Sequence, residues 1–350
     1  MSEFDLIRRY FTRSTPGAVL GVGDDAALLS MVSGTELAIS TDMLVSGTHF
    51  FPDADPFFLG HKTLAVNLSD LAAMGAQPRW ATLALSLPRA DDRWLKEFSR
   101  GFFALADQHG VELIGGDTTR GPLNLCVTIM GEIPCGAALQ RSGARIGDDI
   151  WISGHLGDAA LALAYMQSQV ALTEADFARC AGALHQPVPR LALGLALRGV
   201  ARSAIDISDG LIADLGHILD CSKVGAEIYF DALPVSELMR SLSPGSSAKG
   251  RQSTIRQAGC GVDTSAGGSG GRDSAGERGL FQRCVLAGGD DYELCFTAPA
   301  SQRDQLGKIS RRINLPLTRI GTIVAGSSCV VRSAEGGNIN IGESGYDHFR

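Results

Sequence analysis

No apolar run in this sequence approaches the roughly 20 residues that a membrane-spanning helix needs. The first residues (MSEFD) also lack the basic stretch followed by an apolar one that is typical of a signal peptide. The 8 cysteines are scattered, form no C-x-x-C pair, and are sparser than those of a small secreted disulfide scaffold. We therefore expect reduced thiols and a cytoplasmic protein.

The sequence also lacks the positive charge of a nucleic-acid-binding protein. Its 31 Lys and Arg are outnumbered by 38 Asp and Glu, and the formal net charge is -7 at pH 7. Phosphate backbones are held by clustered Lys and Arg, so no nucleic-acid partner is expected. Phosphate ligands remain compatible with this charge, because Mg²⁺ can bridge acidic side chains to phosphates.

Several well-known nucleotide and metal motifs are missing too. The chain has no G-x-x-x-x-G-K-[ST] and no complete G-x-G-x-x-G after a strand, which argues against a P-loop NTPase and a dinucleotide-binding fold. It has no H-E-x-x-H, so zinc is not indicated. Without H-R-D and D-F-G it does not resemble a protein kinase.

What is present is the composition of a globular protein with two domains. The 350 residues are 45% hydrophobic and 20% charged, enough to bury two cores. Strand-like apolar runs alternate with helix-like stretches, which predicts an α/β (α+β) architecture. We place the boundary near residues 145–149, between a domain of residues 1–146 and a domain of residues 147–350.

The expected elements follow from apolar periodicity. Strands are predicted at residues 37–41, 80–87, 111–114, 123–131, 150–153, 203–207, 227–230, 284–287 and 292–297. Helices are predicted at residues 62–74, 91–109, 158–169, 189–200, 211–221 and 302–313.

One segment does not fit this alternation. Residues 259–279 are rich in Gly and Ser and nearly free of large apolar side chains, so they cannot repay the entropy of ordering. A Gly-rich run can cradle phosphate, but only between a strand and a helix, and neither is evident here. We expect a flexible insertion at about residues 241–283, and we expect deletion of residues 259–279 to leave turnover nearly intact.

Aspartates recur beside Gly, Ser or Thr where expected strands or helices begin or end. In open α/β sheets ligands collect at the carboxyl ends of strands, and carboxylates there suit Mg²⁺ with its phosphates. Any one of these motifs is also explained as a helix cap or a turn, but six together favour a magnesium and polyphosphate site. The motifs are residues 23–25 (GDD), 40–42 (STD), 69–70 (SD), 115–117 (GGD), 206–209 (DISD) and 288–291 (GGDD).

Longer runs around these aspartates resemble the thiamine-monophosphate kinase family, within the ATP-binding superfamily that includes aminoimidazole ribonucleotide synthetase. The most specific are NLSDLAAMGA at residues 67–76 and IGGDTTRGP at residues 114–122. The others are GVGDDAAL (21–28), ISTD (39–42), RSGA (141–144), SAIDISDGLIADLG (203–216), GGDDYELCFT (288–297) and GYDHF (345–349).

The resemblance implies an aminoimidazole ribonucleotide synthetase-like fold of two domains, a homodimer formed through the N-terminal mixed sheet, and ATP and metals between the domains. The implied reaction converts ATP and thiamine monophosphate to ADP and thiamine diphosphate by direct in-line transfer with several Mg²⁺ ions. The implied metal ligands are Asp25, Ser40, Thr41, Asp42, Asp70, Asp117, Asp206 and Asp209, with Asp24 a neighbour. The implied nucleotide contacts are Gly116, Asp117, Arg141 and Ser208, and the implied substrate contacts are His49, Asp290 and Tyr346. Asp42, Asp117, Asp209 and Arg141 are the implied catalytic residues.

Two features depart from the family pattern. Asp290 stands where the family usually has Glu, so the carboxylate is one methylene shorter. The insertion before residue 288 is longer than the family pattern predicts. Two other functions stay open at this stage: another ATP-dependent synthetase of the superfamily, and a nucleotide-binding regulator without catalysis. The absence of any Cys before Cys126 argues against a selenophosphate synthetase.

Overall fold

The computed structural model describes residues 2–243, 272–340 and 345–346, without the side chains of residues 272–278. The chain divides into two compact units, which are considered separately. The first unit comprises Met1–Gln140 and His185–Val200, and the second comprises Arg141–Leu184 and Ala201–Arg350. Residues 185–200, which follow the second unit's first helices in sequence, therefore pack with the first unit.

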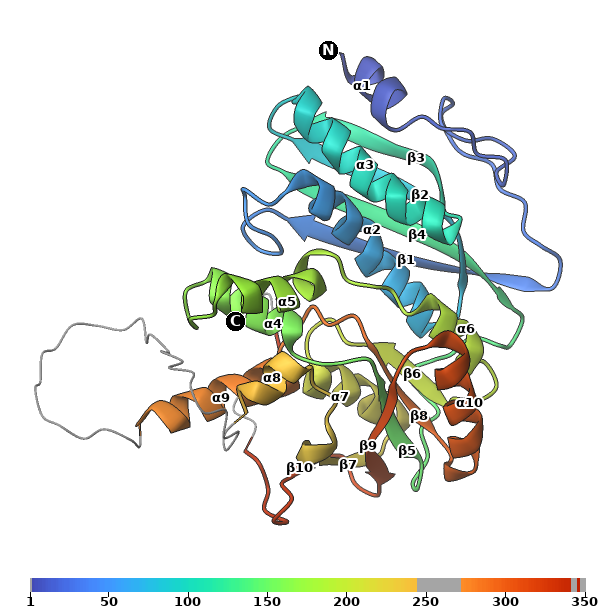
Figure 1. Ribbon diagram of the computed structural model, residues 1–350. Coiled ribbons are helices and arrows are strands. Elements are labelled where there is room, and N and C mark those ends of the chain that lie inside the picture. Colours follow the sequence, from blue (N-terminus) through green and yellow to red (C-terminus); the bar gives the residue numbers. More distant parts are fainter. Residues whose placement is uncertain (1, 244–271, 341–344, 347–350) are drawn as a thin grey trace, which may run out of the picture. The chain divides into compact units, whose positions relative to one another are not determined.

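The first unit is a four-stranded mixed sheet with helices on one face (Figure 1). The strand order is β1-β4-β2-β3, antiparallel except for the parallel pair β2 and β3. Its strands are β1 (Thr35–Val45), β2 (Gln77–Leu87), β3 (Glu112–Arg120) and β4 (Asn124–Pro134). Its helices are α1 (Glu3–Tyr10), α2 (Pro56–Ala73), α3 (Asp92–His109) and α6 (Leu191–Leu197).

Helices α2 and α3 form the core of this unit with the sheet. Phe98 and Phe102 of α3 and Leu64 of α2 are fully buried, and so are Leu125 and Ile129 of β4. The opposite face of the sheet has no helix on it in the described part of the first unit, and along β1 it exposes large apolar side chains. Within the described part of this unit the sheet is therefore covered by helices on one face only.

The second unit contains a six-stranded mixed sheet of order β10-β7-β9-β5-β8-β6. Only the pair β10 and β7 is parallel. Its strands are β5 (Asp149–Ser153), β6 (Ser203–Asp206), β7 (Gly225–Tyr229), β8 (Leu294–Ala298), β9 (Leu317–Val324) and β10 (Cys329–Arg332). Its helices are α4 (Asp158–Met166), α5 (Glu174–His185), α7 (Leu211–Ser222), α8 (Glu237–Ser241), α9 (Arg272–Leu286) and α10 (Arg303–Ile313), with short 3-10 turns η1 (Phe230–Ala232) and η2 (Ala300–Gln302).

Both units combine helices with a mixed sheet, which confirms the predicted α/β (α+β) class. Three local predictions were wrong. Residues 284–287 are not a strand, because α9 continues to Leu286. Its buried face contains Leu280, Phe281, Cys284 and Val285. A short apolar run in the sequence does not distinguish such a helical face from a strand. Helix α9 begins at Arg272, so the end of the segment predicted to be flexible is helical.

The third wrong prediction concerns β3, which does not end before the GGD motif. It runs to Arg120 because β2 pairs with it in parallel along its whole length, a partner that is distant in sequence. The remainder of the predicted insertion, residues 244–271, lies outside the described residues. Among the residues that the structure describes, no helix is long and apolar enough to cross a membrane.

Candidate functional site

Four of the predicted metal ligands in the first unit lie on β1 and α2. The hydroxyl of Ser40 donates a hydrogen bond of 2.5 Å to Oδ2 of Asp70, which lies within α2. The hydroxyl of Thr41 lies 2.8 Å from that of Thr128 on β4. Asp42 is half-buried, and its backbone N–H donates a hydrogen bond to a side-chain oxygen of α2. Because successive side chains of a strand point to opposite faces, Ser40 and Asp42 share the α2 face with Asp70, whereas Thr41 lies on the opposite face of the sheet.

That side chain of α2 belongs to Asn67, a residue that the sequence prediction missed. Its Oδ1 accepts from the N–H of Asp42 at 3.1 Å, and its Nδ2 donates to the carbonyl of Thr63 at 3.1 Å. Asn67 is almost completely buried in a helix that is otherwise largely apolar. A polar residue inside the apolar run of residues 64–73 was the signal that could have identified it, since buried polar groups are bonded.

The GGD motif lies in an irregular part of β3. Gly116 has φ +151°, and a Cβ there would lie 1.9 Å from the carbonyl oxygen of Leu83, so β2 and β3 require glycine at this position. Asp117 follows it and is exposed. Gly116 is in register with Leu83, Val127 and Asp42 across the sheet, so three strand spacings of about 4.8 Å, roughly 14 Å, separate β1 from β3 here. The backbone of one chain therefore keeps Asp42 and Asp117 well apart.

The remaining predicted residues of the first unit lie in loops. Asp24 and Asp25 are exposed in a turn that contains Gly23 at φ +128°, and Oδ1 of Asp24 accepts from the N–H of Asp25 at 3.0 Å. His49 lies in the turn after β1, where its Nδ1 accepts from the N–H of Val45 at 3.0 Å. In neutral His49 this bond leaves the ring proton on Nε2.

In the second unit the DISD motif forms the loop between β6 and α7. Asp206 ends β6 and is buried, while Ser208 and Asp209 are half-buried. Helix α7 has Gly210 as its N-cap without a side-chain cap bond, so Asp209 does not cap it. Asp42 and Asp117 lie within strands and Asp70 lies within a helix, so the helix-cap explanation does not apply to these residues either.

Backbone hydrogen bonds join this loop to the GGDD motif. The N–H of Asp290 donates to the carbonyl of Ser208, and the N–H of Tyr292 donates to that of Ile207, each at 2.8 Å. Asp290 adopts φ +67°, and its Oδ1 accepts from the Tyr292 hydroxyl at 3.1 Å. A Cβ at Gly289 would lie 2.4 Å from the carbonyl oxygen of Ser208, so the close approach of the two loops depends on glycine. The predicted substrate carboxylate is thereby held next to the predicted metal loop.

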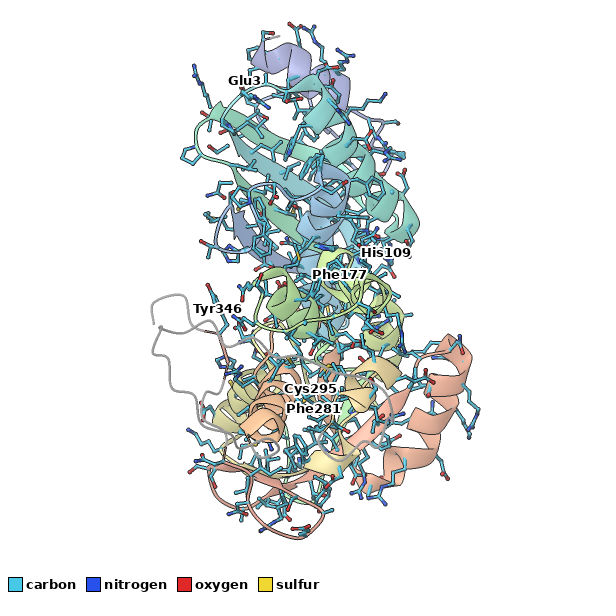
Figure 2. The ribbon with its side chains drawn as sticks, turned by 60° about the vertical axis from the view of Figure 1, so that its left-hand side comes forward. Glu3, His109, Phe177, Phe281, Cys295 and Tyr346 are labelled. Carbon is cyan, nitrogen blue, oxygen red and sulfur yellow. The ribbon has the colours of Figure 1, made fainter. Side chains whose placement is uncertain are left out.

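The C-terminal GYDHF segment reaches the same place, as far as it is described. The N–H of Tyr346 donates to the carbonyl of Asp209 at 3.1 Å. The Tyr346 side chain is 53% exposed at the surface of the second unit (Figure 2). The structure therefore brings Asp206, Ser208, Asp209, Asp290 and Tyr346 together, although they come from three separate parts of the sequence. Arg141 lies at the start of this unit and is exposed.

Two further acidic residues support these loops and had no predicted role, although Asp291 belongs to the GGDD motif. Asp291 accepts the N–H of Gly157, ahead of α4, with both carboxylate oxygens at 3.0 and 3.1 Å, and burial raises its pKa well above the usual value. Asp214 accepts three N–H groups of the DISD loop, and burial raises its pKa to about 7 against the effect of those bonds. The acidic residue in the first turn of the helix predicted at 211–221 was the available signal.

The predicted ligand set has the chemistry that Mg²⁺ requires, since it consists of carboxylates and hydroxyls, and hard oxygen donors suit this ion. The described residues nevertheless contain no group of three or more His, Cys, Asp or Glu side chains arranged to hold a metal. The residues predicted as ligands occur in both units, which are considered separately.

Comparison with known proteins agrees with this chemistry. Residues 23–133 match the family described as AIR synthase related protein, N-terminal domain, and residues 145–333 match the corresponding C-terminal domain. The thiamine-monophosphate kinase of Salmonella typhimurium is 44% identical over 352 residues, which cover 99% of this chain and 98% of that protein.

Solved structures extend the similarity to the fold. The crystal structure of thiamine-monophosphate kinase from Stenotrophomonas maltophilia is 46% identical, covers 96% of each chain and has a TM-score of 0.76. A structure of AaThiL complexed with AMPPCP and TMP is 25% identical, covers 99% of this chain and 96% of that one, and has a TM-score of 0.71.

Proposed function

Because the chain belongs to the thiamine-monophosphate kinases of the AIR synthase-related family, we propose that it phosphorylates thiamine monophosphate with ATP, giving thiamine diphosphate and ADP. The observation that carries the proposal is the assembly of the DISD loop, the GGDD loop and Tyr346 in the second unit. The complex of AaThiL with AMPPCP and TMP supports the same pair of substrates.

The reaction joins two polyanions, so its main requirement is charge neutralisation and alignment. A phosphate oxygen of thiamine monophosphate attacks the γ-phosphorus of ATP in line, a new P–O bond forms, and the bond to the β-phosphate oxygen breaks to release ADP. The attacking oxygen is already ionised near neutral pH, so the protein needs no strong general base. We expect no covalent enzyme intermediate.

Mg²⁺ would supply the neutralising charge and link the two phosphate chains. We assign its ligands to both units: Asp25, Ser40, Thr41, Asp42, Asp70 and Asp117 in the first, and Asp206 and Asp209 in the second. Asp42, Asp117 and Asp209 are the catalytic carboxylates in this proposal. Ser40 orients the carboxylate of Asp70 through its hydrogen bond to it. Asn67 holds the backbone of Asp42 by accepting its N–H.

The remaining roles concern the substrates. Arg141 can clamp phosphate oxygens with two parallel N–H bonds. Gly116, Asp117 and Ser208 would contact ATP. His49, Asp290 and Tyr346 would contact thiamine monophosphate, and the exposed ring of Tyr346 suits stacking on a cationic heterocycle. The short Asp290 side chain already accepts from the Tyr292 hydroxyl, so that bond would orient its carboxylate toward the substrate.

We also propose a homodimer formed through the uncovered face of the N-terminal sheet. Ile39 is 59% exposed and Met43 52% exposed on the same face of β1, and their partners on β4 are Met130 and Cys126. Large apolar side chains that gather on an open sheet face are typical of an interaction surface. A cytoplasmic location fits the cysteines of the described residues, which are all free thiols.

One assay tests the central proposal. Purified protein, Mg-ATP and thiamine monophosphate should yield thiamine diphosphate and ADP in equal amounts. ADP without thiamine diphosphate would indicate another synthetase of the superfamily, and neither product would indicate a non-catalytic nucleotide-binding protein.

Single substitutions test the site within the same assay. Asp42→Ala and Asp117→Ala should each remove activity with little change in thermal stability. The control is Asp107→Ala, which removes only an exposed ion pair with Arg13. Wild-type turnover in the first two variants would mean that these carboxylates have no part in the reaction.

A further inference from the structure

The N-terminus of helix α7 is already occupied by an anion of the protein itself. Oδ2 of Asp214 accepts hydrogen bonds from the backbone N–H groups of Ser208, Asp209 and Gly210, at 3.1, 3.0 and 3.1 Å. Asp214 lies in the first turn of α7 and is only 3% exposed. Three donors therefore converge on one buried carboxylate oxygen.

This arrangement changes what the DISD loop can bind. The first N–H groups of a helix ordinarily attract phosphate or another anion. Here Asp214 takes the donors of the loop, so phosphate cannot use them. Three consecutive carbonyls of the loop are also engaged: those of Ile207 and Ser208 accept from the GGDD loop, and that of Asp209 accepts from Tyr346. The residues of the loop that carry side-chain oxygen are Asp206, Ser208 and Asp209.

We propose that Asp214 is a positioning residue that makes the loop from Asp206 to Gly210 a cation site and not a phosphate site. It fixes the backbone on both sides of Asp209, and its negative charge favours Mg²⁺ held by Asp206 and Asp209. Partners behind metal ligands typically change metal affinity by about 10- to 100-fold. Ser208 then contacts the nucleotide through its hydroxyl and not through its backbone N–H.

The inference rests on the proposed magnesium-dependent function, so its test measures metal binding separately from turnover. The probe is Mg²⁺ titrated calorimetrically into the full-length chain in the presence of AMPPCP, at one fixed pH for all variants. Asp214→Asn keeps an oxygen for the three N–H groups and removes the charge. Asp220→Asn is the matched control, since Asp220 is exposed on the same helix.

The Asn variant should bind Mg²⁺ about 10- to 100-fold more weakly, while the control binds like the wild type. In the turnover assay its Mg²⁺ requirement should rise, with kcat largely restored at high Mg²⁺ and an unchanged KM for thiamine monophosphate. A purely structural cap would lower the melting temperature and leave Mg²⁺ affinity unchanged, and that result would overturn the proposal.

A second variant keeps the test decisive if the Asn variant does not fold. Asp214→Glu retains the charge but moves the carboxylate by one methylene relative to the three N–H groups. This variant should also bind Mg²⁺ more weakly than the wild type. Wild-type affinity for Mg²⁺ would refute the positioning role. If wild-type protein makes no thiamine diphosphate, the proposed function fails, whereas the comparison of Mg²⁺ affinities still decides the role of Asp214.

Discussion

The hydroxyl of Ser40 donates a 2.5 Å hydrogen bond to the carboxylate of Asp70, and this bond ties strand β1 to helix α2. Both residues are proposed metal ligands. Ser40 therefore has two possible contributions, as an oxygen ligand and as a donor that holds Asp70 in one orientation. Neither contribution requires Ser40 to carry charge.

Removal of Asp70 should be far more harmful than removal of Ser40. Asp70→Ala deletes a carboxylate and should reduce kcat below detection. Ser40→Ala deletes a hydrogen bond to a charged group, worth about 1.5–3 kcal/mol, so kcat should fall by roughly 10- to 100-fold. Steady-state kinetics at several Mg²⁺ concentrations measures both. Ser33→Ala, in the exposed turn before β1, is the control, and an unaffected Ser40→Ala enzyme would contradict the assigned role.

Local signals in the sequence predicted the elements that depend on local interactions. Helix α3 illustrates this: the apolar stripe and the acids before it predicted residues 91–109, and Asp91 indeed caps the helix by accepting from the N–H groups of Arg93 and Trp94. The order of most strands and helices followed from the same periodicity. The segments resembling the kinase family indicated which loops to examine.

Long-range pairing could not be predicted in this way. Strand β3 continues through Gly116 because β2, about thirty residues earlier, supplies its hydrogen-bond partners. Residues 185–200 pack with the first unit, where His185 stacks on Phe58 and His61 bonds to the carbonyl of Pro187. The supporting roles of Asn67 and Asp214 also depend on backbone groups whose positions only the fold defines.

The histidines of the first unit should make its stability depend on pH. Burial lowers the pKa of His61, His109 and His185 below the usual 6.5. Between the lowered values and 6.5 the unfolded chain binds more protons than the folded one, so the free energy of unfolding rises with pH in this window. The contribution of these histidines to the free energy of unfolding should thus be fully present above pH 6.5. It should be lost as the pH falls below 6.5.

Hydrogen exchange measured by mass spectrometry, corrected for the intrinsic effect of pH, can follow α2 and α3 separately. Their protection should fall on acidification below pH 6.5. His61→Gln, which can still donate to the carbonyl of Pro187, should reduce this dependence. Unchanged protection of both helices down to pH 5 would show that the histidines are not coupled to folding.

The exposed face of β1 should determine the oligomeric state. Ile39→Arg places a charge within the apolar row of Leu37, Ile39 and Met43, and burial of an unpaired charge in an interface is costly. Sedimentation velocity should show a dimer for the wild type and a monomer for this variant. Val188→Arg, at an exposed residue of the same unit outside the sheet, should remain dimeric. A dimeric Ile39→Arg protein would place the interface elsewhere.

The last prediction separates two reasons for glycine in the first unit. Gly116 and Gly110 both have positive φ, at +151° and +66°, but only Gly116 is confined, with the carbonyl oxygen of Leu83 1.9 Å from where a Cβ would lie. A Cβ at Gly110 meets nothing within 4 Å. Gly110→Ala should therefore cost only backbone strain of about 1–2 kcal/mol.

Gly116→Ala should cost that strain and a further 1–3 kcal/mol or so, because a methyl group cannot fit without moving β3 away from β2. Since Asp117 follows directly, the displacement should also weaken the binding of Mg-AMPPCP, which the Gly110 variant leaves unchanged. Urea unfolding and calorimetric titration of the two variants test both expectations. Equal losses of stability in the Gly110→Ala and Gly116→Ala variants would mean that β3 can move away from β2 at little cost. The contact with Leu83 would then not determine the geometry of the GGD motif.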